Sequence, residues 1–331
     1  MSLVPKLRSS RPRLYVCVVA VVAFVAMLCQ LRLASILSCP AGGYESNRFL
    51  EYCQAEAYGD YDHGAFLFGL EPEAERFARD ADVMFLGNSR EQFAFSTDEV
   101  DRWFASRTIR HYLLGFSYHD GHRFAREVLR TIKPQAKAYI INMDEFFAPH
   151  LSAAAEPLFK NRTESLQHYQ TKRSWQSVHK GLCGRVPMLC GQSFAVFRVK
   201  DTGRWIRTLG QFQSEPVSND PVVDEEAVRQ ETSLGVGFLN NLTARRECVI
   251  LTHVPTGQSK RARAEAIARS LKLVLISPSL DGLRTFDGSH LDQESAARFS
   301  QAFLEAAGPR IQKCVSQPTD FSGILVAPQS N

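Results

Sequence analysis

The chain has 331 residues, of which 44% are hydrophobic and 22% are charged. This is enough apolar material for one large domain or, at most, two small ones. The formal net charge is +4 at pH 7, and part of this excess lies in the first 13 residues. The charge balance of the remaining chain excludes a strongly basic protein, so we expect no nucleic acid as a partner.

The N-terminal segment has the pattern of a membrane anchor. A basic tail over residues 1–13 precedes an uncharged apolar run from Leu14 to Leu31, whose length suits a hydrocarbon core of about 30 Å. The basic residues predict a cytoplasmic tail, a single-pass transmembrane anchor over residues 14–37, and a periplasmic or extracellular domain at the cell membrane. A cleaved signal peptide is one alternative. A lipoprotein signal is another, because residues 36–39 loosely resemble a lipobox. All three interpretations export the main domain.

Eight cysteines are present, and two of them, Cys17 and Cys29, lie in the predicted anchor. An exported domain permits disulfides, and the pairs Cys183–Cys190 and Cys39–Cys53 are close enough in sequence to form them. The spacings do not match a compact zinc motif. The sequence therefore predicts no metal site.

Residues 38–80 have the composition of a polar lead-in, and a regular pattern begins at residue 81. Short apolar runs then alternate with amphipathic segments. Strands are predicted at 82–86, 110–116, 138–143, 248–253 and 273–276, and helices at 97–106, 121–133, 222–245, 257–270 and 292–306. This alternation predicts an α/β fold, a three-layer sandwich with a five-stranded parallel sheet.

The alternation pauses between the third and the fourth predicted strand. Residues from about 147 to 220 have no clean period, and we expect an insertion packed on the α/β domain of residues 81–310. The stretch 160–207 is basic; it could face an anionic polymer or lipid head groups, but a solvated surface is the simpler explanation. Residues 311–331 are predicted to form a disordered tail.

Three polar residues have the order and the placement of a catalytic triad. Ser89 follows the first strand in LGNSR, and Asp287 and His290 precede the last helix in FDGSHLD. A serine nucleophile needs an imidazole base, and the imidazole needs a carboxylate to orient it. Each motif alone has a simpler explanation, a helix-capping serine or a loop Asp with an exposed His. Together, near the carboxyl edge of a parallel sheet, they predict a Ser–His–Asp site.

This layout resembles that of the SGNH (GDSL-type) hydrolases. The segment from Gly87 to Ser89 matches the first block of that family, and the segment from Asp287 to His290 matches the last. The resemblance offers Gly115 for the second block and Asn142 for the third. It implies an oxyanion hole made by the backbone N–H groups of Ser89 and Gly115 and the side-chain amide of Asn142. Asp144 competes with Asn142, because the usual glycine before the asparagine is missing.

The arginine after the serine makes LGNSR similar to a membrane-anchored branch, the DltD-type and polysaccharide O-acetylation proteins. The resemblance implies a flavodoxin-like SGNH fold. It also implies an extracytoplasmic serine ester hydrolase or O-acyltransferase that acts on acyl esters of cell-envelope saccharides, chiefly acetyl esters, through an acyl-serine. An integral-membrane acyl donor protein is then a partner, and no metal or organic cofactor is needed. The alternative is a catalytically inactive SGNH-like binding or scaffold protein in an envelope polysaccharide modification or export complex.

Four further residues have open or structural roles. Arg90 could hold a substrate carboxylate or phosphate, or pair with an acid. His253, at the end of the fourth strand, fits a structural or substrate-side role better than a catalytic one. His119 and His122 flank a turn that begins a helix, and for both the structural role is favoured.

Overall fold

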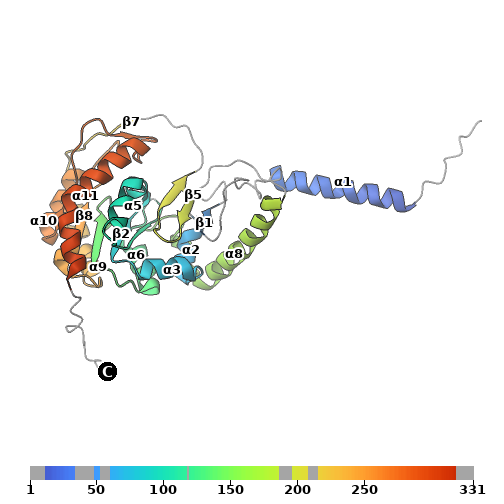
Figure 1. Cartoon of the computed structure of the whole chain (residues 1–331), viewed down its shortest axis with the longest axis horizontal. Helices are drawn as coiled ribbons and strands as arrows, with labels where there is room; N and C mark the ends of the chain where they lie inside the picture. Colours follow the sequence, from blue (N-terminus) through green and yellow to red (C-terminus); the bar gives the residue numbers. More distant parts are fainter. Residues whose placement is uncertain are drawn as a thin grey trace, which may run out of the picture.

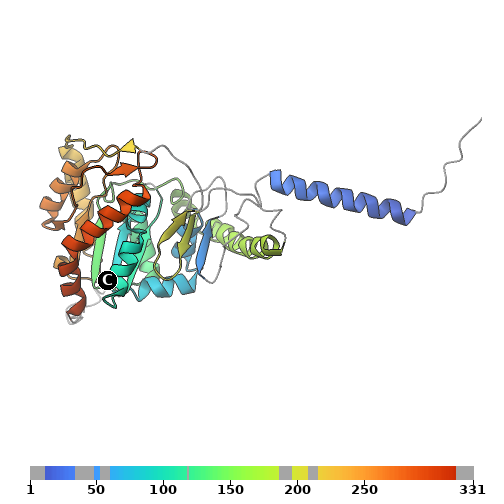
Figure 2. The ribbon, with the colours of Figure 1, turned by 45° about the horizontal axis from the view of Figure 1, so that its top comes forward.

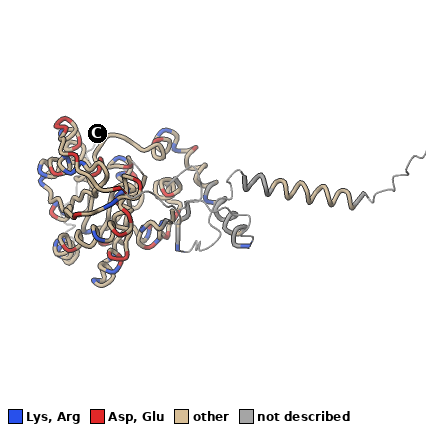
Figure 3. The backbone as a smooth tube through the Cα atoms, turned by 90° about the horizontal axis from the view of Figure 1, so that it is seen from above, with Lys and Arg blue, Asp and Glu red and all other residues tan. Residues whose placement is uncertain are grey.

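The structure, a computed structural model, describes residues 12–33, 48–52, 60–117, 119–185, 196–207 and 215–317. The first described segment is the helix α1 (Pro12–Leu33), whose side chains from Leu14 to Met27 are exposed (Figure 1). Within the described residues, no helix combines the length and the apolar character needed to cross a membrane. The anchor stays a prediction. Figure 3 shows basic and acidic residues interspersed along the rest of the chain.

A five-stranded parallel sheet lies at the centre of the fold. Its strands are β2 (Val83–Gly87), β3 (His111–Gly115), β4 (Ala138–Asn142), β8 (Val249–Thr252) and β9 (Val274–Leu275), in the order β3-β2-β4-β8-β9. Every residue of the first four is buried, as expected for apolar strands that are covered on both faces. The predicted α/β class and parallel sheet are confirmed, and the strand order is the flavodoxin-like one.

Helices cover both faces of the sheet (Figures 1 and 2). Met84 and Leu86 face one apolar cluster, and their neighbours Val83 and Phe85 face the other. The first cluster includes side chains of α2 (Asp60–Phe68), α3 (Pro72–Arg79), α6 (His122–Ile132), α9 (Glu225–Leu239) and α10 (Arg261–Leu271). The second includes side chains of α4 (Ser89–Phe95), α5 (Asp98–Ala105) and α11 (Gln293–Ser316). The fold therefore has three layers.

The five predicted helices are present with shifted ends. The hydroxyl of Thr97 caps α5 by accepting from the N–H of Val100, as predicted. Helix α11 is longer than predicted and runs to Ser316, because Ile311 and Cys314 extend its buried stripe beyond Pro309. The predicted disordered tail thus begins too early, and residues 318–331 lie outside the described part of the chain.

The lead-in is more than a polar spacer, because α2 and α3 belong to the core. Ala65, Phe66 and Ala74 are fully buried there. The short strand β1 (Phe49–Tyr52) also pairs with the insertion, in an antiparallel sheet of order β1-β5-β6 with β5 (Val196–Val199) and β6 (Trp205–Arg207). This small sheet therefore joins the segment that precedes β2 in the sequence to the segment that follows β4.

Within the described residues, the rest of the insertion contains two helices and a short strand. These are α7 (Glu156–Lys160), α8 (Arg162–Arg185) and β7 (Glu215–Pro216). β7 pairs with β10 (Arg284–Thr285), just before the predicted Asp–His motif, and a 3-10 turn, η2 (Arg246–Cys248), leads into β8. The described residues of the insertion thus contact the α/β domain.

Arg198 fixes the insertion to the end of β3. Its side chain is fully buried and donates to Asp62 Oδ2 at 2.7 Å and to the carbonyls of Leu113 and Gly115. Next to it, His63 lies between Asp62 and Asp120, with nitrogen–oxygen distances of 3.1 and 2.6 Å. Burial opposes protonation of His63, but the two carboxylates outweigh it and raise its pKa to about 10. A compensated group of buried charges therefore lies beneath the end of β3.

A disulfide joins Cys248 to Cys314, with 5.7 Å between the Cα atoms. It connects the start of β8 to the end of α11, and it was not predicted. The two pairs proposed from the sequence, Cys183–Cys190 and Cys39–Cys53, lie outside the residues whose side chains are described.

Candidate active site

The three predicted triad residues lie in hydrogen-bonding contact. His290 Nε2 is 2.8 Å from Ser89 Oγ, and His290 Nδ1 is 2.7 Å from Asp287 Oδ2. A carboxylate only accepts hydrogen bonds, so Nδ1 carries the proton and Nε2 accepts from the serine hydroxyl. This is the arrangement that lets an imidazole remove a proton from a serine.

Ser89 is the first residue of α4 and directly follows the turn after β2. Asn88 caps the helix, because its Oδ1 accepts from the N–H of Arg90 at 3.0 Å. The backbone N–H of Ser89 has no acceptor inside the helix, as for any residue at this position. The turn therefore places a serine hydroxyl and a backbone donor together at the positive end of a helix.

The segment that carries Asp287 and His290 is a closed loop. Asp287 Oδ1 accepts from the N–H groups of Ser289 and His290, at 3.0 and 2.8 Å, and the N–H of Phe286 donates to the His290 carbonyl. Burial raises the pKa of Asp287, but the hydrogen bonds with His290 outweigh it and hold the pKa below its usual range. The carboxylate is therefore ionised at neutral pH and orients the imidazole.

Two aromatic rings fix the other faces of His290. Phe93 packs edge-on at 4.8 Å between ring centroids, and Phe286 stacks on it at 5.4 Å. The same two rings also line a cavity of about 590 Å³, together with Trp205 of the insertion. The triad residues themselves do not line that cavity.

The structure brings the three proposed oxyanion-hole residues to the same edge of the sheet. Asn142 ends β4 and is buried; its Oδ1 accepts from the N–H of Val254 at 3.1 Å. This bond fixes the amide, and its Nδ2 has no hydrogen-bond acceptor among the residues that the structure describes. Gly115 ends β3 beside the serine turn, where a Cβ would lie 2.7 Å from the carbonyl oxygen of Asn88.

Asp144, the competitor of Asn142, has a different role. Its carboxylate pairs with Arg90 Nη1, and its Oδ2 accepts from Asn88 Nδ2 at 3.0 Å. Burial opposes ionisation of Asp144, but Arg90 outweighs it and lowers the pKa. An ionised carboxylate is only an acceptor, so Asp144 cannot donate to an oxyanion. It holds the serine turn instead.

Arg90 has acidic and hydroxyl partners in the structure, which supports pairing with an acid. Besides Asp144, its Nε donates to Ser289 Oγ at 2.9 Å. Ser289 lies between Asp287 and His290, so Arg90 joins the serine turn to the loop of the other two triad residues. This joining role was not predicted.

His253 and His122 have structural contacts, as the sequence favoured. His253 is buried, with Nε2 at 2.7 Å from Ser259 Oγ, and burial lowers its pKa to about 4. His122 begins α6, and its backbone N–H donates to the carbonyl of Phe146 at 2.7 Å. Among the described residues, neither ring has a hydrogen bond or a ring contact with a triad residue.

Glu91 is a buried residue that the sequence analysis missed. Its side chain is fully buried between Gly87 and Gly115, and a Cβ at Gly115 would lie 2.1 Å from Glu91 Oε2. Neither carboxyl oxygen has a hydrogen-bond partner among the described residues. Burial raises the pKa of Glu91 to about 8, although the charge of Arg198 opposes this. Glu91 is therefore a neutral acid at pH 7.

The chain matches no protein-family model, and no characterised protein or solved structure is significantly similar to it.

Proposed function

We propose that the chain is an SGNH-type serine ester hydrolase or O-acyltransferase, with Ser89 as nucleophile, His290 as base and Asp287 as the residue that orients the base. The observation that carries the proposal is the continuous hydrogen-bonded series Ser89–His290–Asp287. Side chains 201 positions apart in the sequence meet in the order that nucleophilic catalysis requires.

In the first half-reaction, Ser89 Oγ forms a bond to the acyl carbon of an ester while His290 Nε2 takes the hydroxyl proton. The carbonyl oxygen becomes an oxyanion, which accepts from the N–H groups of Ser89 and Gly115 and from Asn142 Nδ2. When the intermediate collapses, the bond to the leaving alkoxide breaks, and His290 returns the proton to that oxygen. The products are an acyl-serine and an alcohol.

In the second half-reaction, His290 removes a proton from water or from a sugar hydroxyl, whose oxygen then attacks the acyl carbon of the acyl-serine. The bond between that carbon and Ser89 Oγ breaks, and His290 returns the proton to Ser89 Oγ. Water gives hydrolysis, and the sugar gives O-acylation. With the predicted anchor, this chemistry would take place outside the cytoplasmic membrane on acyl, chiefly acetyl, esters of envelope saccharides. An integral-membrane acyl donor protein is the partner that a transferase would need.

The test is covalent labelling of the full-length chain with a fluorophosphonate, which reacts with activated serines. We expect the wild-type chain to be labelled and Ser89→Ala and His290→Ala to be unlabelled. Ser106→Ala and His168→Ala are matched controls, because both residues are exposed and lie outside the site. Absence of labelling in a folded wild-type chain would contradict the proposed enzymatic activity and favour the catalytically inactive scaffold protein.

A turnover assay with an ester substrate examines the oxyanion hole and the acceptor. Asn142→Ala should slow turnover of a short-chain aryl ester by about 10²–10³-fold, the usual cost of one oxyanion donor. Adding an oligosaccharide acceptor then separates the two activities, because a transferase gives an O-acylated sugar and a hydrolase gives only the free acid. Unchanged turnover in Asn142→Ala would remove this residue from the proposed site.

A further inference from the structure

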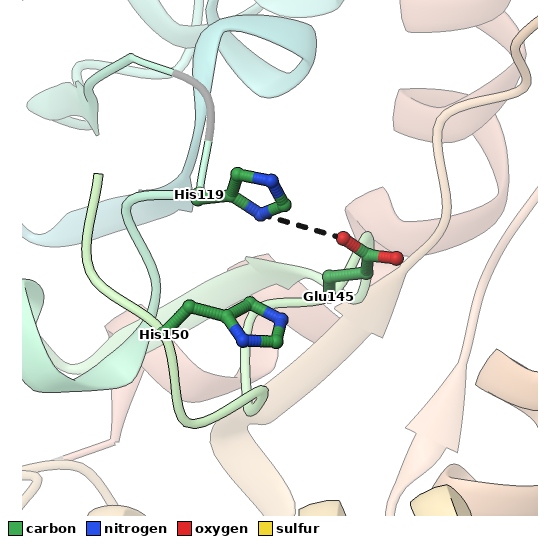
Figure 4. A group of neighbouring side chains, drawn as sticks. All are labelled: His119, Glu145 and His150. Atoms are coloured by element: carbon green, nitrogen blue, oxygen red, sulfur yellow. Dashed lines mark ion pairs between the residues drawn. The ribbon is translucent and has the colours of Figure 1, made fainter. Parts of the chain in front are cut away.

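Three potential metal ligands meet at the carboxyl edge of the sheet, outside the triad. His119 lies in the loop after β3, and Glu145 and His150 lie in the loop after β4. One ligand atom from each lies within 4.8 Å of the others. Figure 4 shows the two imidazole rings and the carboxylate gathered around a common space, with His119 Nδ1 at 3.5 Å from Glu145 Oε2.

The two loops are tied to each other and to the buried charges. The N–H of His122 donates to the carbonyl of Phe146 at 2.7 Å, which joins the loop of His119 to that of Glu145. Asp120, next to His119, is held by His63 at 2.6 Å and by the N–H of Ser117 at 3.0 Å. Both loops are therefore positioned by bonds that do not involve the three candidate ligands.

The backbone is strained at two of the three residues. Five non-glycine residues have positive φ in the described part of the chain, and three of them lie at or just after helix ends: Thr108, Lys133 and Lys272. The other two are His119, at 64°, and Glu145, at 54°. This conformation costs of order 1–3 kcal/mol for each such residue, and strain of this kind concentrates at functional sites.

A lysine outside the cluster contacts its carboxylate. Glu145 Oε1 accepts from Lys260 Nζ at 2.7 Å, which leaves Oε2 directed at His119. Lys260 acts as an outer contact that orients the carboxylate.

We propose that His119, Glu145 and His150 bind one divalent transition-metal ion, Zn²⁺ by the preference of their donor atoms. Two imidazoles and one carboxylate suit zinc, whereas Mg²⁺ and Ca²⁺ prefer oxygen ligands alone. Zinc bonds of about 2.0–2.2 Å place tetrahedral ligands a little over 3 Å apart. The cluster would therefore contract slightly, which rotation of the partly exposed side chains allows.

Three protein ligands leave a zinc ion with an open position for water or for an oxygen of a bound molecule. Asp144 connects the cluster to the triad. It precedes Glu145 and contacts Asn88 and Arg90, the two neighbours of Ser89 in the sequence. A saccharide hydroxyl or carboxylate at the same edge has the chemistry to fill this position. Metal binding itself does not depend on the proposed serine chemistry.

The test uses the full-length chain without a histidine tag, stripped with a chelator and titrated with Zn²⁺ against a chromophoric competitor. We expect about one zinc ion per wild-type chain. The single variants His119→Ala, Glu145→Gln and His150→Ala should each bind at least about tenfold more weakly. His168→Ala, an exposed histidine outside the cluster, should bind like the wild type. Binding that is unaffected by the three ligand variants would overturn the proposal, as would a wild-type chain that binds no zinc.

Thermal unfolding separates lost binding from lost folding. In chelator, the ligand variants should unfold at temperatures close to that of the wild type. Added Zn²⁺ should then raise Tm only for the wild type and His168→Ala, because a ligand stabilises only the state that binds it. A zinc-dependent rise in Tm that persists in the His119→Ala/His150→Ala double variant would place the ion elsewhere. Fluorophosphonate labelling of the metal-free wild type tests the reactivity of Ser89 independently of zinc binding.

Discussion

At the scale of single residues, Glu91 has a protonation state set by its surroundings. Its pKa is about 8 in the fold, whereas an unperturbed glutamate titrates near 4.3. The folded state therefore binds the proton more tightly than the unfolded chain does. The stability that this proton contributes is complete below about pH 4 and is lost as the pH rises through the folded pKa.

We expect Glu91→Gln to remove this pH-dependent loss of stability, because glutamine has the shape of glutamate and cannot ionise. The free energy of unfolding of the wild type should fall relative to that of the variant between about pH 5 and pH 8, by at most about 1.4 kcal/mol per pH unit. Urea unfolding at several pH values measures the difference. Glu305→Gln, at an exposed position of α11, is the control and should run parallel to the wild type. Parallel curves for Glu91→Gln would mean that Glu91 is ionised in the fold.

The residues that could be predicted were those whose chemistry is visible in a short motif. Ser89, Asp287 and His290 lie in two segments of five to seven residues, and the structure brings all three together. Glu91 could not be found in this way, because its burial depends on the approach of β3. The cluster of His119, Glu145 and His150 was missed for the same reason. Its three residues come from two separate loops, so their spacing in the sequence matches no metal-binding motif.

At the scale of secondary-structure elements, one side chain holds the insertion in place. Arg198 of β5 is fully buried and reaches Asp62 on α2 and two carbonyls of β3. Removing one partner of a buried ion pair leaves the other charge without compensation, which usually costs about 3–5 kcal/mol. We expect Arg198→Met to lower the free energy of unfolding by this amount in urea titrations.

A paired substitution distinguishes lost charge compensation from lost packing. Arg198→Met combined with Asp62→Asn removes both charges and should recover part of the stability, which a double-mutant cycle measures. Fluorophosphonate labelling of Ser89 should also weaken in Arg198→Met, since the carbonyl of Gly115 loses a donor. If Arg198→Met were as stable as the wild type, β5 would have to be held by its strand pairing alone.

The strands of the parallel sheet could be predicted from the sequence, whereas α4 and the sheet β1-β5-β6 could not. The strands of the parallel sheet are continuous apolar runs, because both of their faces are covered. Helix α4 was missed, since its sequence SREQFAF is short and partly polar although it is mostly buried. The sheet β1-β5-β6 was missed because it pairs segments from distant parts of the chain, and nothing in a local pattern records such pairing.

At the scale of the whole molecule, the disulfide between Cys248 and Cys314 closes a large part of the chain. It spans 66 residues, and a loop of this size stabilises a fold by about 4 kcal/mol in the chain-entropy model. Neither partner has a nearby cysteine in the sequence, so the pairing could not be predicted. Such a bond forms in oxidising compartments, which agrees with the proposed export.

We expect the double variant Cys248→Ala/Cys314→Ala to lose about this free energy of unfolding. Thermal and urea unfolding of the oxidised wild type and the variant measure it. Cys17→Ala is the control, because Cys17 is a free cysteine of α1 and should not affect the domain. Equal stability of the double variant and the wild type would show that the bond adds nothing to this fold.

The loop with Asp287 and His290 is bound to the insertion as well as to the sheet. β7 pairs with β10, Thr285 Oγ1 donates to the carbonyl of Glu215 at 3.2 Å, and the N–H of Gly257 donates to the carbonyl of Gly288 at 2.9 Å. A molecule that displaced β7 would therefore move the base without touching the nucleophile. An effector that bound at β7 would therefore change the rate of the proposed acylation from a position away from Ser89, by moving His290 relative to the serine hydroxyl.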